Sequence, residues 1–231
     1  MHNLGLYKIG RAIFRTFVAH PDNVRLATQG PIIRDLLPDK IGLSLDIGCG
    51  TGRYTEWLNA RSKIVIGIDK NLNILKKLLS KSIKAGVVCA SAEQLPFRSD
   101  TFNFALCTEV LEHLDNDGIA ISEMNKILKS NGELVLSVPM LPPPYPDNLH
   151  KKQGYLDSEI KYLLHKYSFE VVHLGYCMLF ISRYILRFVL TFRKLFGFPP
   201  PILPLVWIEQ FMRREREKRS PFNLVVKAKK K

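Results

Sequence analysis

Three glycines alternate in the segment Asp46-Ile47-Gly48-Cys49-Gly50-Thr51-Gly52-Arg53. Glycine tolerates positive φ angles and lets backbone N–H groups approach a ligand closely. A helix is expected to begin directly after this segment, and a helix N-terminus favours an anion such as a carboxylate. The segment therefore predicts a turn that binds an anionic part of a small ligand.

A second candidate, Asp69, ends the apolar run 64–68 and follows Asp46 by 23 residues. A carboxylate at this place can accept hydrogen bonds from both hydroxyls of a ribose, and each such charge-assisted bond contributes roughly 1.5–3 kcal/mol. A glycine-rich turn alone could be a tight strand–helix corner, but its pairing with Asp69 favours a nucleoside-containing ligand. The dinucleotide fingerprint G-x-G-x-x-G would need glycine where Arg53 stands, which disfavours a nicotinamide oxidoreductase.

Apolar, β-prone runs alternate with helical patterns along the chain. Strands are expected over residues 43–47, 64–68, 87–90, 102–107, 134–138, 169–174 and 222–226. Helices are expected over 54–60, 72–83 and 119–128, the last ended by Asn131-Gly132, and from about Asp157, a good N-cap residue. Continuous apolar strands alternating with helices predict a doubly wound α/β fold.

The formal net charge of +13 is concentrated near the C-terminus. Residues 183–231 carry a net charge of +10, whereas residues 1–182 carry only +3. The main body is therefore nearly balanced, and the total charge is not by itself a nucleic-acid signal.

The chain shows no recognisable export signal, because Lys8, Arg11 and Arg15 interrupt the only apolar stretch near Met1. The longest uncharged runs after residue 170 are shorter than the ~18 residues that a bilayer-spanning helix needs. The four cysteines are widely spaced with no C-x-x-C pair, which fits a reducing compartment. We expect a cytoplasmic protein, with peripheral membrane contact as the alternative.

Three further segments share their order and spacing with one family: Ser91-Ala92-Glu93-Gln94-Leu95-Pro96-Phe97, Phe102–Cys107 and Glu109-Val110-Leu111-Glu112-His113. With the glycine-rich segment and Asp69, they make residues 43–174 resemble the class I S-adenosylmethionine-dependent methyltransferases, especially their broad small-molecule branch, the type 11-like enzymes. The resemblance implies a methyltransferase with S-adenosylmethionine as cofactor. It also implies a Rossmann-like, seven-stranded, mostly parallel sheet with helices on both faces and the last strand antiparallel.

At the methionine end of the cofactor, the resemblance implies a cradle made by Gly48, Gly50 and Gly52, with Asp46 supporting that turn. The backbone at Cys107-Thr108 would face the methionine amine and the donor methyl group.

At the nucleoside end, the resemblance implies that Asp69 holds the ribose and that Ala92 and Glu93 lie beside the adenine. Ser91 stands where the family usually has an acid that accepts a hydrogen bond from the adenine amino group. This contact is therefore expected to be weaker or to be made through the backbone.

Methyl transfer itself requires no particular side chain, because the donor sulfonium is already activated. Holding donor and acceptor in position can supply ~7–11 kcal/mol of the barrier, and a base matters only when the acceptor must first lose a proton. Glu109, Glu112 and His113 begin immediately after the fourth strand, where the acceptor should lie. We predict that they act as the base or orient the acceptor.

The spacing E-x-x-E-H has a second interpretation, because some methyltransferases of this fold bind a divalent metal through it. Glu109, Glu112 and His113 could then form part of a metal site. No motif in the sequence assigns a further metal ligand. His150 is within reach, but it is only a histidine in a loop. We therefore predict no metal and leave this interpretation open.

Residues 175–219 are too long for an ordinary connection and too apolar for a disordered linker. Arg183, Arg187 and Lys194 fall on one helical stripe beside aromatic and aliphatic residues, which predicts a basic amphipathic helical insertion. Such an insertion suits an anionic membrane surface or a lid on the domain. Residues 1–38 are predicted to form an N-terminal helical cap, so that residues 1–231 make a single methyltransferase domain.

An apolar cover at each end favours a small, hydrophobic or lipid-like methyl acceptor. An RNA methyltransferase that uses the basic C-terminal region is the first alternative, but the D/N-P-P-Y sequence of amino-methylating nucleic-acid enzymes is replaced after the fourth strand by Cys107-Thr108-Glu109-Val110. Nucleic acid is thereby disfavoured as a partner. A non-catalytic S-adenosylmethionine-binding protein is the second alternative.

Overall fold

The computed structural model describes residues 21–81, 83–143, 147–177, 188, 191–192, 195–196, 221 and 223–231. The chain groups into two compact units, Met1–Ile32 with Tyr176–Phe222 and Ile33–Gly175 with Asn223–Lys231. The predicted cap and insertion make up most of the first unit and lie largely outside the described residues, so both stay predictions. Of this unit the structure describes the start of helix α2 (Pro21–Leu36) and a few helical positions between 188 and 196. No helix within the described ranges is long and apolar enough to span a membrane.

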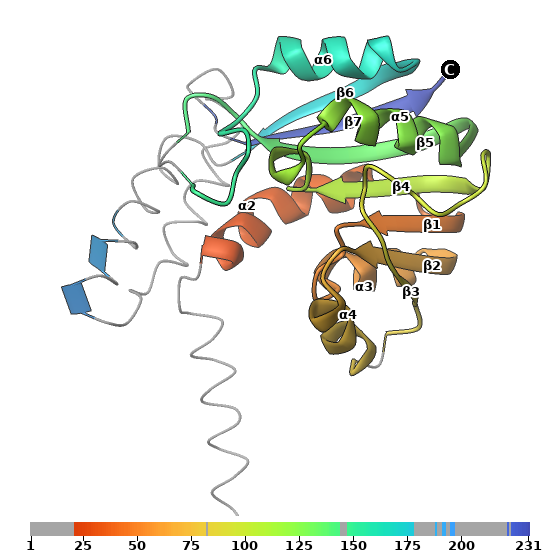
Figure 1. Ribbon diagram of the computed structural model, residues 1–231, viewed down its shortest axis with the longest axis horizontal. Helices are drawn as coiled ribbons and strands as arrows, with labels where there is room; N and C mark the ends of the chain where they lie inside the picture. The colour runs from red at the N-terminus through yellow and green to blue at the C-terminus, as the bar shows by residue number, and fades with distance from the viewer. Residues whose placement is uncertain are drawn as a thin grey trace, which may run out of the picture. The chain divides into compact units, whose positions relative to one another are not determined.

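The second unit contains a seven-stranded sheet in the order β3-β2-β1-β4-β5-β7-β6 (Figure 1). The strands are β1 (Ile41–Ile47), β2 (Ser62–Asp69), β3 (Gly86–Cys89), β4 (Phe102–Thr108), β5 (Leu128–Pro139), β6 (Phe169–Cys177) and β7 (Asn223–Lys230). Strands β1 to β5 pair in parallel, and β7 runs antiparallel to β5. The predicted Rossmann-like sheet, with its antiparallel last strand, is confirmed.

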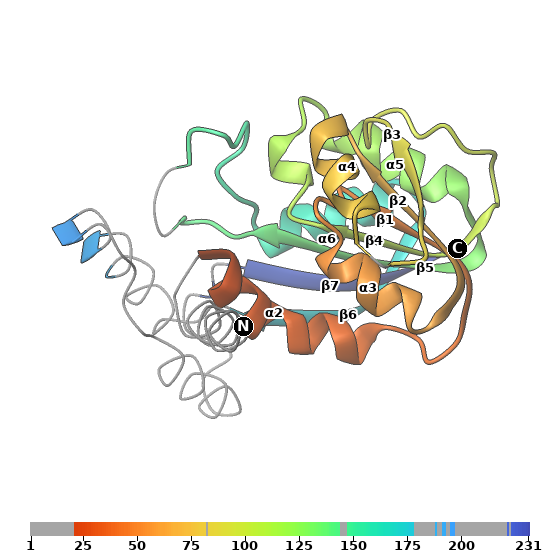
Figure 2. The ribbon, with the colours of Figure 1, turned by 90° about the horizontal axis from the view of Figure 1, so that it is seen from below.

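Helices cover both faces of this sheet. Within the second unit they are α3 (Arg53–Asn59), α4 (Leu72–Leu79), the short 3₁₀ helix η1 (Leu111–His113), α5 (Asp117–Ile127) and α6 (Asp157–Lys166). The helices α3 and α4 lie on one face, and α5 and α6 on the other (Figures 1 and 2). Asn71 and Asn116 start α4 and α5, because each side chain accepts a backbone N–H of the first turn. The predicted double winding is therefore observed.

The core lies where the central strands are covered on both sides. Leu45 and Ile47 of β1 and Phe104 and Leu106 of β4 are almost fully buried. Parallel strands with helices on both faces need such continuous apolar runs. This rigid centre fixes the loops that follow β1, β2 and β4 at one edge of the sheet.

The sequence predicted that Asn131-Gly132 ends a helix, and this prediction is wrong. Helix α5 ends at Ile127 and β5 begins at the next residue. Asn131 has φ +63°, and the β4–β5 register shifts there, from Phe102 opposite Leu128 to Phe104 opposite Glu133. A Cβ at position 132 would lie 2.7 Å from the carbonyl oxygen of Lys129. The Asn-Gly pair therefore makes an irregularity inside the strand, where positive φ and a missing side chain are needed.

Asp157 was predicted as the N-cap of a helix, but the N-cap is Leu156, which has no side-chain cap. Asp157 is the first helical residue, and its carboxylate accepts the backbone N–H of Ser158 at 2.8 Å and pairs with Lys161 at 3.2 Å. A negative charge in the first turn stabilises a helix through its dipole. Asp157 therefore stabilises the N-terminus of α6 from the first helical position and not from the N-cap.

The basic residues at the end of the chain continue β7 instead of forming a separate tail. Lys227 Nζ lies 3.0 Å from Glu133 Oε2, and Lys230 Nζ lies 2.9 Å from Asp100 Oδ1. Both lysine side chains are largely buried on β7, which lies between β5 and β6, and both also donate to backbone carbonyls. Part of the positive charge near the C-terminus is therefore neutralised within the fold.

Candidate functional site

The glycine-rich turn joins β1 to α3 through backbone conformations that are strained for residues other than glycine. Gly48, Gly50 and Gly52 have φ values of +70°, +52° and +83°. A Cβ at Gly48 would lie 2.3 Å from Val110 Cγ2, and one at Gly52 would lie 2.2 Å from Leu78 Cδ1. Nothing lies within 4 Å of a Cβ at Gly50. Left-handed φ and close packing explain these glycines, and the space beside Gly50 is open.

Asp69 ends β2 and bridges the glycine-rich turn to the start of α4. Its Oδ2 accepts the backbone N–H of Gly50 at 3.1 Å, and its Oδ1 accepts that of Asn71 at 2.8 Å. Both bonds hold the carboxylate in one orientation at the edge of the sheet. Gly50, which the sequence assigned to the methionine part, and Asp69, which it assigned to the ribose, are thus directly hydrogen-bonded.

Asp46 lies beneath the same turn and is only 1% exposed. Thr55 of α3 donates its hydroxyl to Asp46 Oδ2 at 2.6 Å. Burial raises the pKa of Asp46 to about 7, the hydrogen bond from Thr55 opposes this rise, and the negative charge of Asp69 adds to it. Asp46 therefore holds the first turn of α3 against β1 from inside the protein.

This pKa predicts a pH-dependent stability with a defined sign. Between about pH 4 and pH 7 the folded state keeps a proton on Asp46 that the unfolded state releases, so the free energy of unfolding falls as pH rises. Urea unfolding at pH 5 and pH 8 should show a decrease that is about 2 to 3 kcal/mol larger in the parent than in Asp46→Asn. The exposed Asp39→Asn is the control. Equal decreases in the parent and Asp46→Asn would contradict the assignment.

A cavity of about 600 Å³ opens at this edge of the sheet, within the ~300–1,000 Å³ range of small-molecule sites. Six predicted site residues line it, namely Gly48, Asp69, Ser91, Ala92, Glu109 and His113. The sequence did not identify several others, including Lys70, Asn71, Ile74, Val110, Leu114, Leu149 and Lys151. Lys70, Val110 and Leu114 adjoin predicted residues, whereas Leu149 and Lys151 come from a distant loop whose position has no sequence signal.

The other predicted residues lie around the cavity and are not part of its described lining. Those at the methionine end are Asp46, Gly50, Gly52, Cys107 and Thr108. Burial and nearby carboxylates raise the pKa of the Cys107 thiol, which keeps it neutral as a packing residue. Glu93 lines a neighbouring cavity of about 570 Å³, and its Oε1 accepts the backbone N–H of Asn116 at 2.7 Å.

Glu109 follows β4 with a left-handed backbone, φ +54°. Its Oε1 accepts hydrogen bonds from Ser137 Oγ of β5 at 2.8 Å and from Asn223 Nδ2 of β7 at 2.9 Å. Ser137 and Asn223 are buried, and the sequence had identified neither. Two strands far apart in the sequence therefore orient one carboxylate at the cavity wall.

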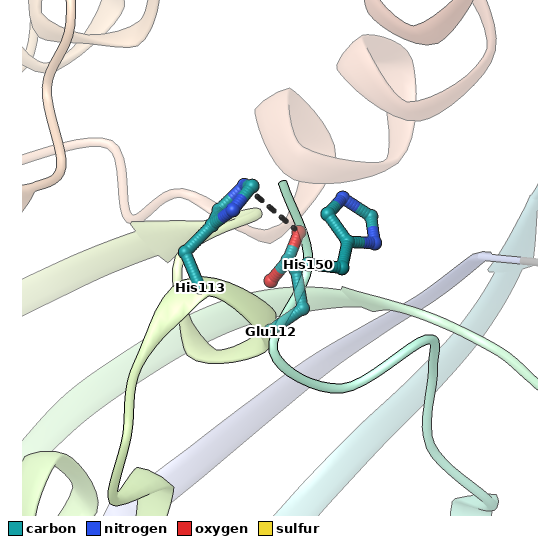
Figure 3. A group of neighbouring side chains, drawn as sticks. All are labelled: Glu112, His113 and His150. Atoms are coloured by element: carbon teal, nitrogen blue, oxygen red, sulfur yellow. Dashed lines mark ion pairs between the residues drawn. The ribbon is translucent and has the colours of Figure 1, made fainter. Parts of the chain in front are cut away.

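Glu112 and His113 belong to η1, and the structure brings His150 beside them (Figure 3). Glu112 is fully buried and is not among the described residues that line the cavity. Its backbone carbonyl accepts N–H groups from Lys151 at 2.8 Å and Lys152 at 3.2 Å. These bonds attach the loop that carries His150 to η1.

Comparison with known proteins gives the following relations. A family model described as a methyltransferase domain matches residues 45–136. The chain is 38% identical over 96 residues to the uncharacterized protein MJ0638 of Methanocaldococcus jannaschii, covering 42% of this chain and 40% of that protein. It is 29% identical over 98 residues to the ubiquinone biosynthesis O-methyltransferase of Photobacterium profundum, covering 40% of this chain and 42% of that protein. The chain therefore spans less than half the length of either relative.

The fold has similar solved structures. An S-adenosylmethionine dependent methyltransferase from Mesorhizobium loti superposes with a TM-score of 0.62 at 17% identity, covering 87% of this chain and 96% of that one. At this identity the likeness concerns the fold alone. Together with the family model, it confirms the predicted resemblance, whose common cofactor is S-adenosylmethionine.

Proposed function

We propose that this chain, whose residues 45–136 form a methyltransferase domain of the class I S-adenosylmethionine-dependent family, transfers the cofactor's methyl group to a small hydrophobic acceptor. The observation that carries the proposal is a single cavity lined by two kinds of residue. Gly48 and Asp69 belong to the candidate cofactor site, and Glu109, Leu114 and Leu149 offer a carboxylate and apolar side chains in the same cavity. Such an arrangement suits a cofactor and an acceptor that meet in one place.

The residues of the glycine-rich turn and the end of β2 fit S-adenosylmethionine. The open space beside Gly50 leaves room for the methionine part, and the backbone N–H groups of the turn suit its carboxylate. Asp69 is held with both oxygens at the cavity wall, where it can accept the ribose hydroxyls. Ser91 and Ala92 form the wall at the place assigned to the adenine. When bound, the cofactor supplies a methyl group that is already activated by its sulfonium.

The chain's own contribution is position and proton removal. The sheet edge fixes the cofactor turn and Glu109 on one rigid frame, which favours a near-attack arrangement. Glu109 is oriented by Ser137 and Asn223, and it can take the proton of an acceptor hydroxyl. His113 also lines the cavity and can orient the acceptor.

The acceptor that we propose is hydrophobic and reacts through oxygen. Val110, Leu114 and Leu149 supply apolar surface to the cavity, and a carboxylate base suits a hydroxyl. One relative is named as a ubiquinone biosynthesis O-methyltransferase, which supports an oxygen on a hydrophobic molecule. The anionic membrane surface predicted from residues 175–219 remains a proposed partner.

Labelled S-adenosylmethionine, with the label in its methyl group, tests this function. The purified chain is incubated with cell extract, which is then separated into lipid, RNA and protein fractions. We expect the label in the organic-soluble fraction. Label in RNA would support the alternative based on the basic region, and an absence of transfer with intact cofactor binding would support a non-catalytic binding protein. Either result would overturn the proposed acceptor.

Glu109→Gln should slow methyl transfer about 100-fold or more while leaving cofactor affinity within about threefold, because general-base catalysis typically contributes 10²–10⁴-fold. Transfer to the fraction labelled by the parent, and calorimetric titration with S-adenosylmethionine, measure the two effects. Ser137→Ala removes one hydrogen bond to the same carboxylate and should slow transfer by only about 5- to 10-fold. An unchanged rate in Glu109→Gln would remove Glu109 from the reaction.

A further inference from the structure

We infer that Glu112, His113 and His150 bind one divalent transition-metal ion beside the cavity, at the wall to which His113 contributes. Each offers one ligand atom, and these atoms all lie within 4.8 Å of one another. The three side chains come from η1 and from the loop before Tyr155, and Figure 3 shows them grouped together, with the Glu112 carboxylate between the two imidazoles. Two imidazoles and a carboxylate form a donor set that suits zinc, manganese or iron.

The spacing of the three ligand atoms is close to that of a metal centre. The centre of a triangle with sides of 4.8 Å lies about 2.8 Å from each corner, and metal–nitrogen and metal–oxygen bonds are about 2.0–2.2 Å. Each ligand atom would therefore have to move by less than about 1 Å. Side-chain rotation alone covers that distance.

The hydrogen bonding of His113 leaves a nitrogen ready to bind a metal. Its Nδ1 lies 3.1 Å from the carbonyl oxygen of Leu149. A carbonyl can only accept, so Nδ1 is the donor, and in the neutral form of this ring the lone pair is on Nε2. That nitrogen is 4.0 Å from Glu112 Oε1. A backbone carbonyl on the far nitrogen is the usual partner of a metal-binding histidine, because it fixes the tautomer and the ring orientation.

The loop that brings His150 is held in place by several bonds. Besides the two N–H groups that Lys151 and Lys152 donate to the Glu112 carbonyl, the N–H of His150 donates to the Asp147 carbonyl at 3.1 Å. Asp147 Oδ2 lies 3.6 Å from His150 Nε2. The loop's own backbone bonds therefore present His150 to η1, as a built binding site requires.

Burial strengthens the attraction between Glu112 and a cation. The Glu112 side chain is 1% exposed, and opposite charges attract more strongly where water is excluded. A divalent ion between Glu112 and the two imidazoles would supply positive charge at bonding distance.

The assignment differs from the E-x-x-E-H pattern of the sequence. Glu109 is not a member of the group, and its Oε1 is held by Ser137 and Asn223. Three protein ligands leave at least one position open on the ion. Because His113 also lines the cavity, the ion would lie at the cavity wall, where it would supply Lewis-acid chemistry to a bound acceptor. The binding of the ion itself does not depend on the proposed methyl transfer.

The chelator-treated full chain, titrated with Co²⁺ and separately with Zn²⁺, tests the site. We expect one Co²⁺ per chain, with visible absorption bands that Zn²⁺ abolishes by competition. Glu112→Gln and His150→Gln should each weaken binding at least 100-fold, and His150→Gln keeps the test sound if the buried variant fails to fold. Absence of saturable binding by the parent would overturn the proposal and leave a Glu112–His113 ion pair instead.

Two control variants locate the ion. His173→Gln removes an exposed imidazole from β6 and should leave the titration unchanged. Glu109→Gln should change Co²⁺ affinity by less than about threefold. If it weakens binding as much as Glu112→Gln, the three-residue assignment is wrong. Titration with S-adenosylmethionine in the absence of metal reports the cofactor site separately, so failure of one proposal is distinguishable from failure of the other.

Discussion

Asp69→Ala is expected to lower the affinity for S-adenosylmethionine by about 100-fold or more. The carboxylate is fixed at the cavity wall by the N–H groups of Gly50 and Asn71. In the proposed complex it also accepts two ribose hydroxyls, and each bond to a charged group contributes about 1.5–3 kcal/mol. Calorimetric titration of the parent and the variant measures the loss. Parent-like binding would remove Asp69 from the site.

Because Asp69 also supports the glycine-rich turn, the loss must be separated from a change in the turn. A cofactor analogue without the ribose 2′-hydroxyl makes this separation. The parent should bind the analogue about 10-fold more weakly than the natural cofactor, whereas Asp69→Ala should bind both alike. A penalty that persists in the variant would place the ribose elsewhere. Asp39→Ala, an exposed change in the same unit, should leave both affinities unchanged.

The sequence was most informative where local chemistry and fold agree. The strands β1 to β4 were located within about two residues because apolar runs bounded by turns leave little freedom. The glycine-rich turn and Asp69 adjoin these strands, and their position at the carboxyl edge follows from the parallel order. Asn131-Gly132 was misinterpreted because the same pair serves a helix stop or a strand irregularity, and only the pairing of β4 with β5 decides.

The sequence was least informative where the site depends on distant contacts. Ser137 and Asn223 reach Glu109 from strands that lie next to each other only in the folded sheet. His150 meets Glu112 through a loop held by backbone N–H groups, which every residue except proline carries. No motif or spacing in the sequence predicts either of these contacts. Such residues follow from the topology and the packing of the chain.

Gly52→Ala is expected to destabilise the fold by about 2–5 kcal/mol. A left-handed φ costs a non-glycine residue about 1–2 kcal/mol, and overpacking a core adds about 1–3 kcal/mol. The new Cβ would lie 2.2 Å from Leu78 Cδ1, within the buried cluster of Cys49, Leu75 and Leu78. Urea unfolding of the parent and the variant measures the change. A loss below about 1 kcal/mol would show that the turn relaxes freely.

The neighbouring Gly50 and the partner Leu78 divide this effect into its parts. Gly50→Ala meets nothing within 4 Å, so it should cost only about 1–2 kcal/mol of backbone strain, yet weaken cofactor binding at least 10-fold because its Cβ enters the proposed methionine site. Leu78→Ala combined with Gly52→Ala should be less destabilised than the sum of the single variants by about 1–2 kcal/mol, since the clash disappears. Strict additivity would assign the whole cost of Gly52→Ala to its φ angle. In that case the glycine at the start of α3 is needed for backbone shape alone, and its contact with α4 carries no energy.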